Sequence, residues 1–348
     1  MLEALLTVPG IILVFIIANI VVGYFLSAPK YSGPVTDHFE GKRFINPGNA
    51  RAKGFLSVFR WVFTRQPAKW VFMNVPFGEK PIERIENGLR ITWINHSTFL
   101  IQVDGLNIIT DPIWSERASP FSWAGPKRFR PPGIRFDDLP QIDIVLLSHN
   151  HYDHLHIETL QKLDEKFHAE IFTSLGVKAF LKEKKIDAEI IEMDWWNEQE
   201  LSDRLKLTSV PAQHFSGRGM FDRDATLWSG FVIGREQGNI YFAADTGYND
   251  STFKEIGNRL SPVSLAIIPI GAYKPRWFMS PIHTSPEESV KIHLDVKSQK
   301  SIASHFGTFP LGDEGRDEAI NELSAAIKKF KLSPGEFVAI DEGTAFQF

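Results

Sequence analysis

The sequence predicts an α/β protein in which mixed sheets are covered by helices on their outer faces. Two observations support this fold class. From residue 90 onward, short apolar runs typical of strands alternate with longer runs typical of helices. The chain also has 348 residues, 43% of them hydrophobic, which is enough to bury a large core as one large domain or two ordinary ones. No internal repeat and no low-complexity segment interrupts the pattern.

The first element is an uncharged apolar segment at residues 5–26. A helix of that length reaches roughly 30 Å, the thickness of a bilayer core, so we predict one transmembrane helix within residues 1–28 and a single-pass membrane location. A cleaved signal peptide is the alternative, but Glu3 precedes the run in place of Lys or Arg, and no Ala-x-Ala site follows. Positive charge after the segment predicts a cytoplasmic catalytic domain, since it gathers at Lys30, Lys42, Arg43, Arg51 and Lys53.

Residues 29–89 are predicted to be a linker and a membrane-proximal segment. Residues 29–54 are rich in Pro, Gly and charge, which is typical of an extended connection. In residues 54–70, aromatic and apolar side chains alternate with basic ones. Such a stretch could lie in the membrane interface, or it could pack on the domain with its basic residues in water. Both interpretations stay open.

Residues 90–348 are predicted to form the catalytic domain. Three closely spaced runs begin it as an antiparallel meander, and the continuous apolar run at 142–147 suits a strand buried on both faces. Pro286 stands where a first helical turn would be, with Ser285 as its N-cap. Strands are predicted at 91–94, 99–103, 107–110, 142–147, 205–210, 228–233, 240–243 and 265–270, and helices at 157–167, 175–183, 286–294 and 316–330.

A cluster of potential metal ligands follows the buried strand. It reads His149-Asn150-His151-Tyr152-Asp153-His154. Because the chain has no cysteine, only His, Asp and Glu are available as ligands. Three imidazoles and one carboxylate in six residues exceed what a single tetrahedral zinc takes from one loop, so the motif predicts two neighbouring metals. A solvated histidine-rich loop is the plainer alternative.

The motif His-x-His-x-Asp-His resembles the hallmark of the metallo-β-lactamase superfamily. The resemblance implies a four-layer αβ/βα sandwich and extends to PAQHF, FAADTGY and IASHFGTF, each at the end of a predicted strand. It implies two Zn²⁺ ions, although iron or manganese could occupy such a site. By resemblance, His149, His151 and His214 hold one metal, Asp153, His154 and His305 hold the second, and Asp245 bridges them.

Longer segments between residues 90 and 345 resemble the family of N-acylphosphatidylethanolamine-hydrolysing phospholipases D. They include ITDPIWSERASPFSWAGPKRFRPP, DWW and IPIGAYKPRWFMSPIHTSPEESVKIHLDV. The resemblance implies a homodimer that binds a membrane phospholipid in the lipid bilayer. It also implies attack of a metal-bridging hydroxide on the phosphodiester, with release of phosphatidic acid and an N-acylethanolamine. The N-terminal apolar segment is outside the mammalian pattern, which indicates a bacterial, membrane-anchored relative.

Two other functions remain as alternatives. One is a membrane-tethered lactonase or phosphodiesterase of a small soluble substrate. The other is a non-catalytic scaffold that keeps zinc for folding, but the complete ligand set argues against it. Nucleic acid is not expected as a partner, because the net charge is −4 and the Lys and Arg residues are scattered.

Several further residues receive roles from the resemblance or from their chemistry. Asp153 could ligate metal and also orient the hydroxide. His283 matches the family's non-ligand histidine and could bind the phosphate or protonate the leaving alkoxide, the alternative being a helix cap. Asp111 resembles a residue that orients a ligand, or it forms a turn. Structural roles are expected for His96 and His293, and no role is given to His156. The segment FSGRGMF, in which Arg218 keeps one positive charge, and Ile282 depart from the family pattern and are expected to line the substrate entrance, so substrate preference stays open.

Overall fold

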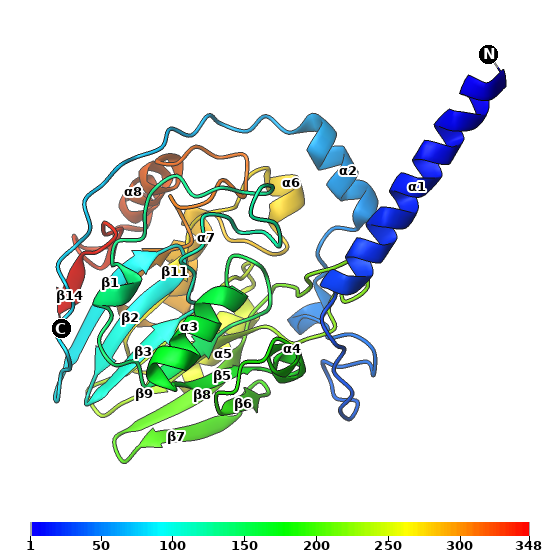
Figure 1. The fold of residues 1–348 in the computed structure, drawn as a ribbon. Helices are drawn as coiled ribbons and strands as arrows, with labels where there is room; N and C mark the ends of the chain where they lie inside the picture. Colours follow the sequence, from blue (N-terminus) through cyan, green and yellow to red (C-terminus); the bar gives the residue numbers. More distant parts are fainter. Residues whose placement is uncertain (1, 348) are drawn as a thin grey trace.

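The computed structural model describes residues 2–347, apart from the side chains of residues 2–10, 12 and 55. Two seven-stranded sheets pack face to face and carry helices on their outer surfaces (Figure 1). The predicted α/β fold with two helix-covered sheets is therefore confirmed. Both sheets combine antiparallel and parallel pairing, and each uses the same scheme.

The first sheet has the strand order β14-β1-β2-β3-β4-β5-β6. Pairing is antiparallel from β14 to β3 and parallel from β3 to β6. The C-terminal strand thus returns to the edge of this sheet. Its strands are β1 (Leu89–Asn95), β2 (Thr98–Val103), β3 (Leu106–Thr110), β4 (Ile144–Leu147), β5 (Glu170–Ser174), β6 (Ile190–Met193) and β14 (Ala345–Gln347).

The second sheet has the order β13-β12-β11-β10-β9-β8-β7. Pairing is antiparallel from β7 to β10 and parallel from β10 to β13. Its strands are β7 (Glu198–Ser202), β8 (Leu205–Pro211), β9 (Ser229–Gly234), β10 (Asn239–Phe242), β11 (Val263–Pro269), β12 (Ser298–Ser304) and β13 (Phe337–Val338).

Helices cover both outer faces. α4 packs on β5 and β6, whereas α7 packs on β11 and β12 and also touches α5 and α8. The helices are α1 (Leu2–Leu26), α2 (Phe55–Thr64), α3 (Ile157–Phe167), α4 (Val177–Glu183), α5 (Asp250–Arg259), α6 (Arg276–Met279), α7 (Pro286–Asp295) and α8 (Glu318–Phe330), with short 3-10 turns at Pro47–Asn49 and Phe136–Asp138.

Strand β4 shows why the sheets stack in layers. Ile144 and Leu146 enter the core between the two sheets, whereas Val145 and Leu147 enter the core beneath the helices of the first sheet. This alternation follows from the two-residue period of a strand. All four side chains are buried, as the continuous apolar run predicts. Each contributes about 1.5–3 kcal/mol relative to an exposed position.

Local signals fix the helix ends. α3 spans the predicted residues, and α7 begins at Pro286 as predicted. The Ser285 side chain accepts from the Glu288 backbone N–H, and the Glu288 side chain accepts from the Ser285 N–H, which completes a capping box. The expected N-cap is therefore confirmed.

The predicted transmembrane helix is not supported. Among the residues that the structure describes, no helix is long and apolar enough to cross a membrane. This finding overturns the predicted single-pass anchor and the membrane location that depended on it. The C-terminal end of α1 instead contacts the loop after β8: the Met220 N–H donates to the Gly23 carbonyl (3.2 Å), and the Ala28 N–H donates to Asp222 (2.8 Å).

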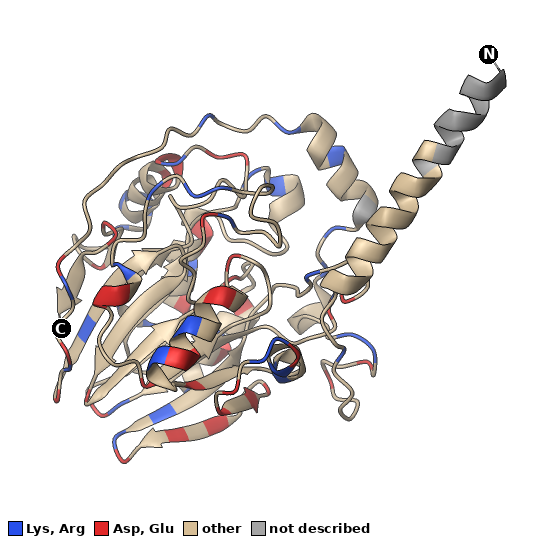
Figure 2. Cartoon of the chain, in the orientation of Figure 1, with Lys and Arg blue, Asp and Glu red and all other residues tan. Residues whose placement is uncertain are grey.

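The predicted linker is extended but packs closely on the second half of the chain. Phe39 and Phe44 are buried with Trp228 in a small apolar cluster. The Phe44 N–H donates to the Asp224 carbonyl at 2.8 Å. Charged residues of both signs are interspersed over the body of the molecule (Figure 2).

Candidate metal centre

Seven histidine and aspartate side chains predicted as metal ligands meet at one end of both sheets. The loop after β4 supplies His149, His151, Asp153 and His154. The second sheet supplies one residue after each of three strands: His214 after β8, Asp245 after β10 and His305 after β12. The carboxyl ends of strands at one sheet edge commonly carry functional loops, which explains this convergence.

The first group consists of His149, His151 and His214. Nδ1 of His151 lies 2.8 Å from Nε2 of His149 and 3.2 Å from Nε2 of His214. Tetrahedral ligands about 2.0–2.1 Å from a zinc ion would be separated by about 3.3 Å. The three nitrogens therefore converge at nearly the spacing that one cation requires.

The second group consists of Asp153, His154, His305 and Asp245. Nε2 of His305 lies 3.4 Å from Oδ2 of Asp153 and 3.1 Å from Oδ2 of Asp245. Nε2 of His154 lies 3.4 Å and 3.2 Å from the same two oxygens. These spacings also match the tetrahedral edge of a metal with N and O ligands.

Asp245 connects the two groups. Its Oδ2 reaches His154 and His305 and also lies 3.7 Å from Nε2 of His214 in the first group. Several buried polar atoms at this point have no hydrogen-bond partner among the described residues: Nε2 of His154, Nε2 of His305 and Oδ1 of Asp245. Buried polar atoms without partners are costly, so their convergence fits metal binding at this point.

Hydrogen bonds outside the cluster fix the ring orientations. Nδ1 of His154 lies 2.7 Å from Oδ2 of Asp111, which also accepts from the Ser148 hydroxyl at 2.7 Å. Nδ1 of His214 lies 2.8 Å from the Ile282 carbonyl. These contacts hold protons on Nδ1 and leave Nε2 free to bind metal. The orienting role predicted for Asp111 agrees with this geometry.

His283 lies at the edge of the cluster. Its ring centroid is 5.0 Å from that of His214, and its Nδ1 is 3.9 Å from Oδ2 of Asp245. Its side chain is 12% exposed, so it is one of the few cluster residues that a substrate can reach. α7 begins only three residues later, and its cap is Ser285, so His283 is not the helix cap.

His96, for which a structural role was expected, lies against the cluster. It follows β1, and its Nε2 lies 3.0 Å from Oδ2 of Asp153, while its ring centroid is 4.0 Å from that of His305. With His154, these residues form one group that could hold a metal. The available signal was its position at the end of a buried strand at the same sheet edge. His293, by contrast, has the expected structural place, with Nδ1 2.8 Å from the Ser301 hydroxyl.

The backbone around the cluster is strained. Positive φ angles occur at His96 (44°), Asp111 (33°), Ala244 (52°) and His305 (58°). Such conformations cost roughly 1–3 kcal/mol each for non-glycine residues and persist only where surrounding contacts enforce them. Gly271 allows one of these contacts, since a Cβ there would lie 1.9 Å from the His305 carbonyl oxygen.

The charges of the cluster are strongly coupled. Burial opposes charge on Asp153 and Asp245, yet His154 holds the pKa of both carboxyls well below the ordinary value. Burial also lowers the pKa of His154 and His305, but the carboxylates outweigh it, raising the pKa of His154 well above its ordinary value and that of His305 to about 9. Protons on these rings compete with metal for the same nitrogens, so metal binding strengthens as the pH rises.

Arg218 does not stand free at a substrate entrance. Its guanidinium donates to the carbonyls of Asn150 (2.8 Å) and Leu155 (3.0 Å) and lies 3.9 Å from the centroid of the Tyr152 ring. It therefore braces the metal-binding loop. The same side chain lines one wall of a cavity of about 340 Å³ that includes His156, whose Nδ1 accepts from the Thr159 N–H to cap α3.

Known proteins share this fold. A β-lactamase superfamily domain matches residues 106–306. N-acyl-phosphatidylethanolamine-hydrolyzing phospholipase D 1 of Caenorhabditis elegans is 36% identical over 92% of this chain and 99% of its own length. The mitochondrial enzyme of that name from Saccharomyces cerevisiae is 32% identical over 64% of this chain and 48% of its own. The structure of an isothiocyanate hydrolase from Delia radicum gut bacteria shares the fold, with a TM-score of 0.61 and 18% identity over 74% of this chain and 99% of its own.

These similarities establish the class of protein first: a metal-dependent hydrolase with the metallo-β-lactamase fold. Within that class, the chain belongs to the family of N-acylphosphatidylethanolamine-hydrolysing phospholipases D.

Proposed function

We propose that this chain hydrolyses N-acylphosphatidylethanolamine, or a related membrane phospholipid, to phosphatidic acid and an N-acylethanolamine. The observation that carries the proposal is a complete His/Asp donor set in a chain that matches the nematode enzyme over nearly its full length. The donors favour zinc, because imidazole and carboxylate ligands at tetrahedral spacing suit that ion. Two zinc ions would be held by His149, His151, Asp153, His154, His214, Asp245 and His305.

Hydrolysis of an anionic phosphodiester requires positive charge at the site. When bound, two such ions neutralise the anionic oxygens of a phosphodiester and lower the pKa of water. Asp153 is 13% exposed and adjoins His96, His154 and His305, so its carboxylate is placed to accept a hydrogen bond from the attacking water. The imidazole of His283 lies next to Asp245. From this position the ring donates a hydrogen bond to the phosphate. Burial lowers the pKa of His283 well below its ordinary value, which favours hydrogen bonding over proton donation.

A lipid hydrolase must also contact the surface of a bilayer, and we place this contact at α2. Leu56 and Phe63 of α2 are 84% and 80% exposed, respectively. Trp61, on another side of the helix, stacks on Phe278 at 5.0 Å and so fixes α2 to the α6 segment that leads to His283. Residues 54–70 were interpreted either as a membrane-interface segment or as a segment packed on the domain. In this proposal α2 does both, because one side of the helix packs on the domain and another presents apolar side chains to the bilayer.

The test is to mix metal-loaded protein with detergent-dispersed N-acylated and plain phosphatidylethanolamines and to identify products by mass spectrometry. We expect phosphatidic acid and the N-acylethanolamine to form with the intact chain and not with the Asp245→Ala variant. If no lipid yields phosphatidic acid while the protein holds its metals, the phospholipase activity is excluded. A hydrolase of small soluble substrates then becomes the better explanation.

A further inference from the structure

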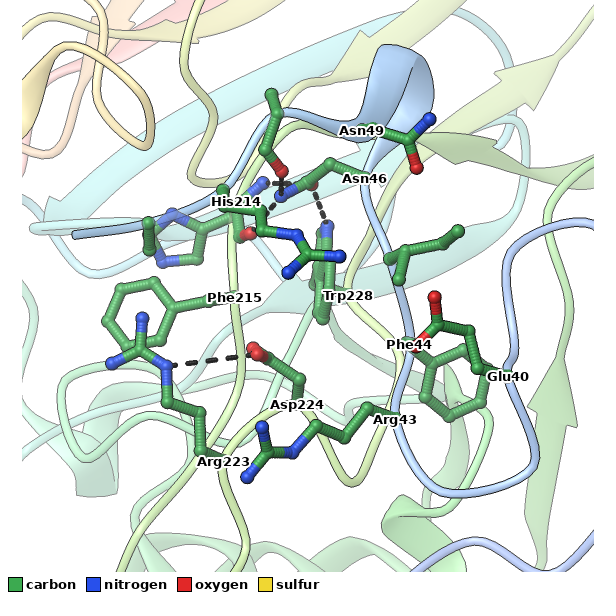
Figure 3. Close-up of a pocket in the computed structure, with 14 residues that line it drawn as sticks. Glu40, Arg43, Phe44, Asn46, Asn49, His214, Phe215, Arg223, Asp224 and Trp228 are labelled. Carbon is green, nitrogen blue, oxygen red and sulfur yellow. Dashed lines mark hydrogen bonds and ion pairs between the residues drawn. The ribbon is translucent and has the colours of Figure 1, made fainter. Parts of the chain in front are cut away.

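A second pocket lies behind the metal centre. It has a volume of about 210 Å³ and is enclosed by residues 40–52 of the N-terminal segment and by the chain from His214 to Trp228 (Figure 3). His214 and Phe215 line it, whereas the other six predicted metal ligands are absent from its described lining. It is therefore a separate cavity that shares one wall with the metal centre.

Three arginines dominate the lining: Arg43, Arg51 and Arg223. Arg223 stacks on Phe215 at 4.7 Å, and its Nε lies 3.7 Å from the Asp224 carboxylate. Arg43 and Arg51 have no side-chain hydrogen bond or ion pair within the described chain. Arginine clusters without carboxylate partners are the usual means of recognising phosphate, because each guanidinium presents a planar fork of donors.

The acidic residues of the pocket do not cancel the positive charge of the three arginines. Burial raises the pKa of Asp224, although Arg223, Arg43 and Arg51, which line the same pocket, each act to lower it. Glu40 is the other acidic residue in the lining. Three guanidiniums face two carboxylates, so the pocket has a net positive charge before any ligand binds.

The floor of the pocket is rigid. The Asn46 side chain accepts from the His214 N–H (2.8 Å) and the Trp228 indole N–H (2.9 Å) and donates to the carbonyls of His214 (2.7 Å) and Ala50 (3.0 Å). Figure 3 shows Asn46, His214 and Trp228 at one end, with Arg43, Arg223 and Asp224 at the other. A preformed floor reduces the ordering cost of binding an anion above it.

We propose that this pocket is a second, non-catalytic anion site that binds the phosphate monoester group of a small ligand or of a lipid headgroup. A dianion offers enough acceptor oxygens for Arg43 and Arg51 together, whereas a single carboxylate is satisfied by one fork. The volume is several times that of one water molecule, which accommodates a phosphate and the first atoms of its ester group. The site exists whether or not the metal centre hydrolyses phospholipids.

The primary experiment is equilibrium dialysis of the metal-loaded full chain against radiolabelled inorganic phosphate at constant ionic strength. We expect the double variant Arg43→Gln/Arg51→Gln to bind phosphate at least roughly tenfold more weakly, since each loses a charge-assisted hydrogen bond. Glu40→Gln, which removes a negative charge from the same wall, is expected to bind phosphate more tightly. Arg259→Gln, on α5 and paired with Glu255, removes one positive charge outside the pocket and is expected to bind like the unmodified chain.

A further variant separates this pocket from the metals. Asp245→Ala removes the predicted bridging ligand and is expected to retain the arginine-dependent phosphate site. The proposal is overturned if the double arginine variant binds phosphate normally, if Arg259→Gln weakens binding equally, or if Asp245→Ala alone abolishes binding. Failure of lipid hydrolysis changes none of these outcomes, so the two proposals are tested independently.

Two further arms identify the source of the phosphate group. Glycerol phosphate is titrated as a soluble ester, and phosphatidylcholine vesicles with and without phosphatidic acid are sedimented with the protein. Competition by glycerol phosphate without selective vesicle binding assigns a soluble ligand. Selective retention on phosphatidic acid vesicles that needs Arg43 and Arg51 assigns a lipid headgroup. Binding in neither arm, with no dialysis signal, overturns the proposal.

Discussion

The two sheets follow one pairing scheme but supply the metal centre in different ways. The first sheet gives four predicted ligands from one loop after β4, whereas the second gives one residue after each of β8, β10 and β12. A single loop brings His149 and His154 near each other through local geometry. His214, Asp245 and His305 meet only when three strands have paired and the sheets have packed. The difference shows that residues of the second sheet complete the cluster, and we therefore expect metal binding to link the two halves of the fold.

The strongest test of this comparison removes Asp245, the predicted bridging ligand that follows β10 of the second sheet. Replacing Asp245 with Ala is expected to lower metal content and to reduce turnover by about a thousandfold or more, because several kcal/mol of charge stabilisation depend on the metals. Metal content by mass spectrometry and lipid turnover would be measured together. Asp250→Ala is a suitable control, since this exposed aspartate forms an ion pair with Lys254 and is not one of the predicted metal ligands. Full metal occupancy and activity in the Asp245 variant would refute the bridge.

The contribution of the first sheet to metal binding can be weakened through Asp111, which contacts the predicted ligand His154 but is not itself a predicted ligand. Asp111→Asn removes the charge beside His154 and Ser148 while keeping the side-chain shape. We expect metal affinity to fall roughly 10- to 100-fold, as is typical when the partner of a ligating histidine is changed. Competition with a coloured chelator measures the affinity. An unchanged affinity would show that the loop holds His154 without Asp111.

The two sheets also differ in how far the sequence alone predicts them. The loop after β4 is recognisable because its ligands are contiguous and follow a buried apolar strand. His214 and His305 were assigned only through the family resemblance, since an isolated histidine after a strand resembles any half-buried one. The position of His96 beside the cluster was not predicted, because its neighbours, Asp153 and His305, are distant in sequence. The arginine pocket was also invisible, since residues 40–52 and 214–228 come together only in the folded chain.

The N-terminal prediction failed for a different reason. Composition at residues 5–26 predicts a membrane span, but composition does not include the contacts that Gly23 and Ala28 make with the loop after β8. Strands β5 and β12 were not assigned as ranges, because polar and charged residues such as Glu170 and Lys300 interrupt their apolar runs. Their pairing with neighbouring strands outweighs this weak local signal.

A smaller effect is expected at the edge of the cluster. His283→Ala should leave metal content intact and slow turnover roughly tenfold or more, which corresponds to one hydrogen bond to a charged group. Turnover at saturating lipid and metal content would be measured on the same preparation. Leu294→Ala, at an exposed position in α7, controls for nonspecific changes near this helix. Unchanged turnover would mean that His283 does not contact the reacting phosphate.

The smallest effect concerns a structural histidine of α7, the helix that packs on the second sheet. Burial lowers the pKa of His293 below 6.5, so as the pH falls through that value the unfolded chain takes up a proton that the folded chain resists. Protonation therefore favours unfolding, and the free energy of unfolding decreases at lower pH. His293→Gln should reduce this dependence, with each unit of pKa shift worth about 1.36 kcal/mol. Urea unfolding at several pH values compares the two proteins, and identical slopes would contradict the prediction.

The most direct test of a metal centre shared by both sheets is anomalous X-ray scattering at the zinc edge from crystals of the zinc-loaded chain. We expect two peaks about 3.5–4 Å apart. One should be surrounded by His149, His151 and His214, the other by Asp153, His154 and His305, with Asp245 touching both. A single peak bound only by the loop after β4, or peaks away from this cluster, would contradict the shared centre.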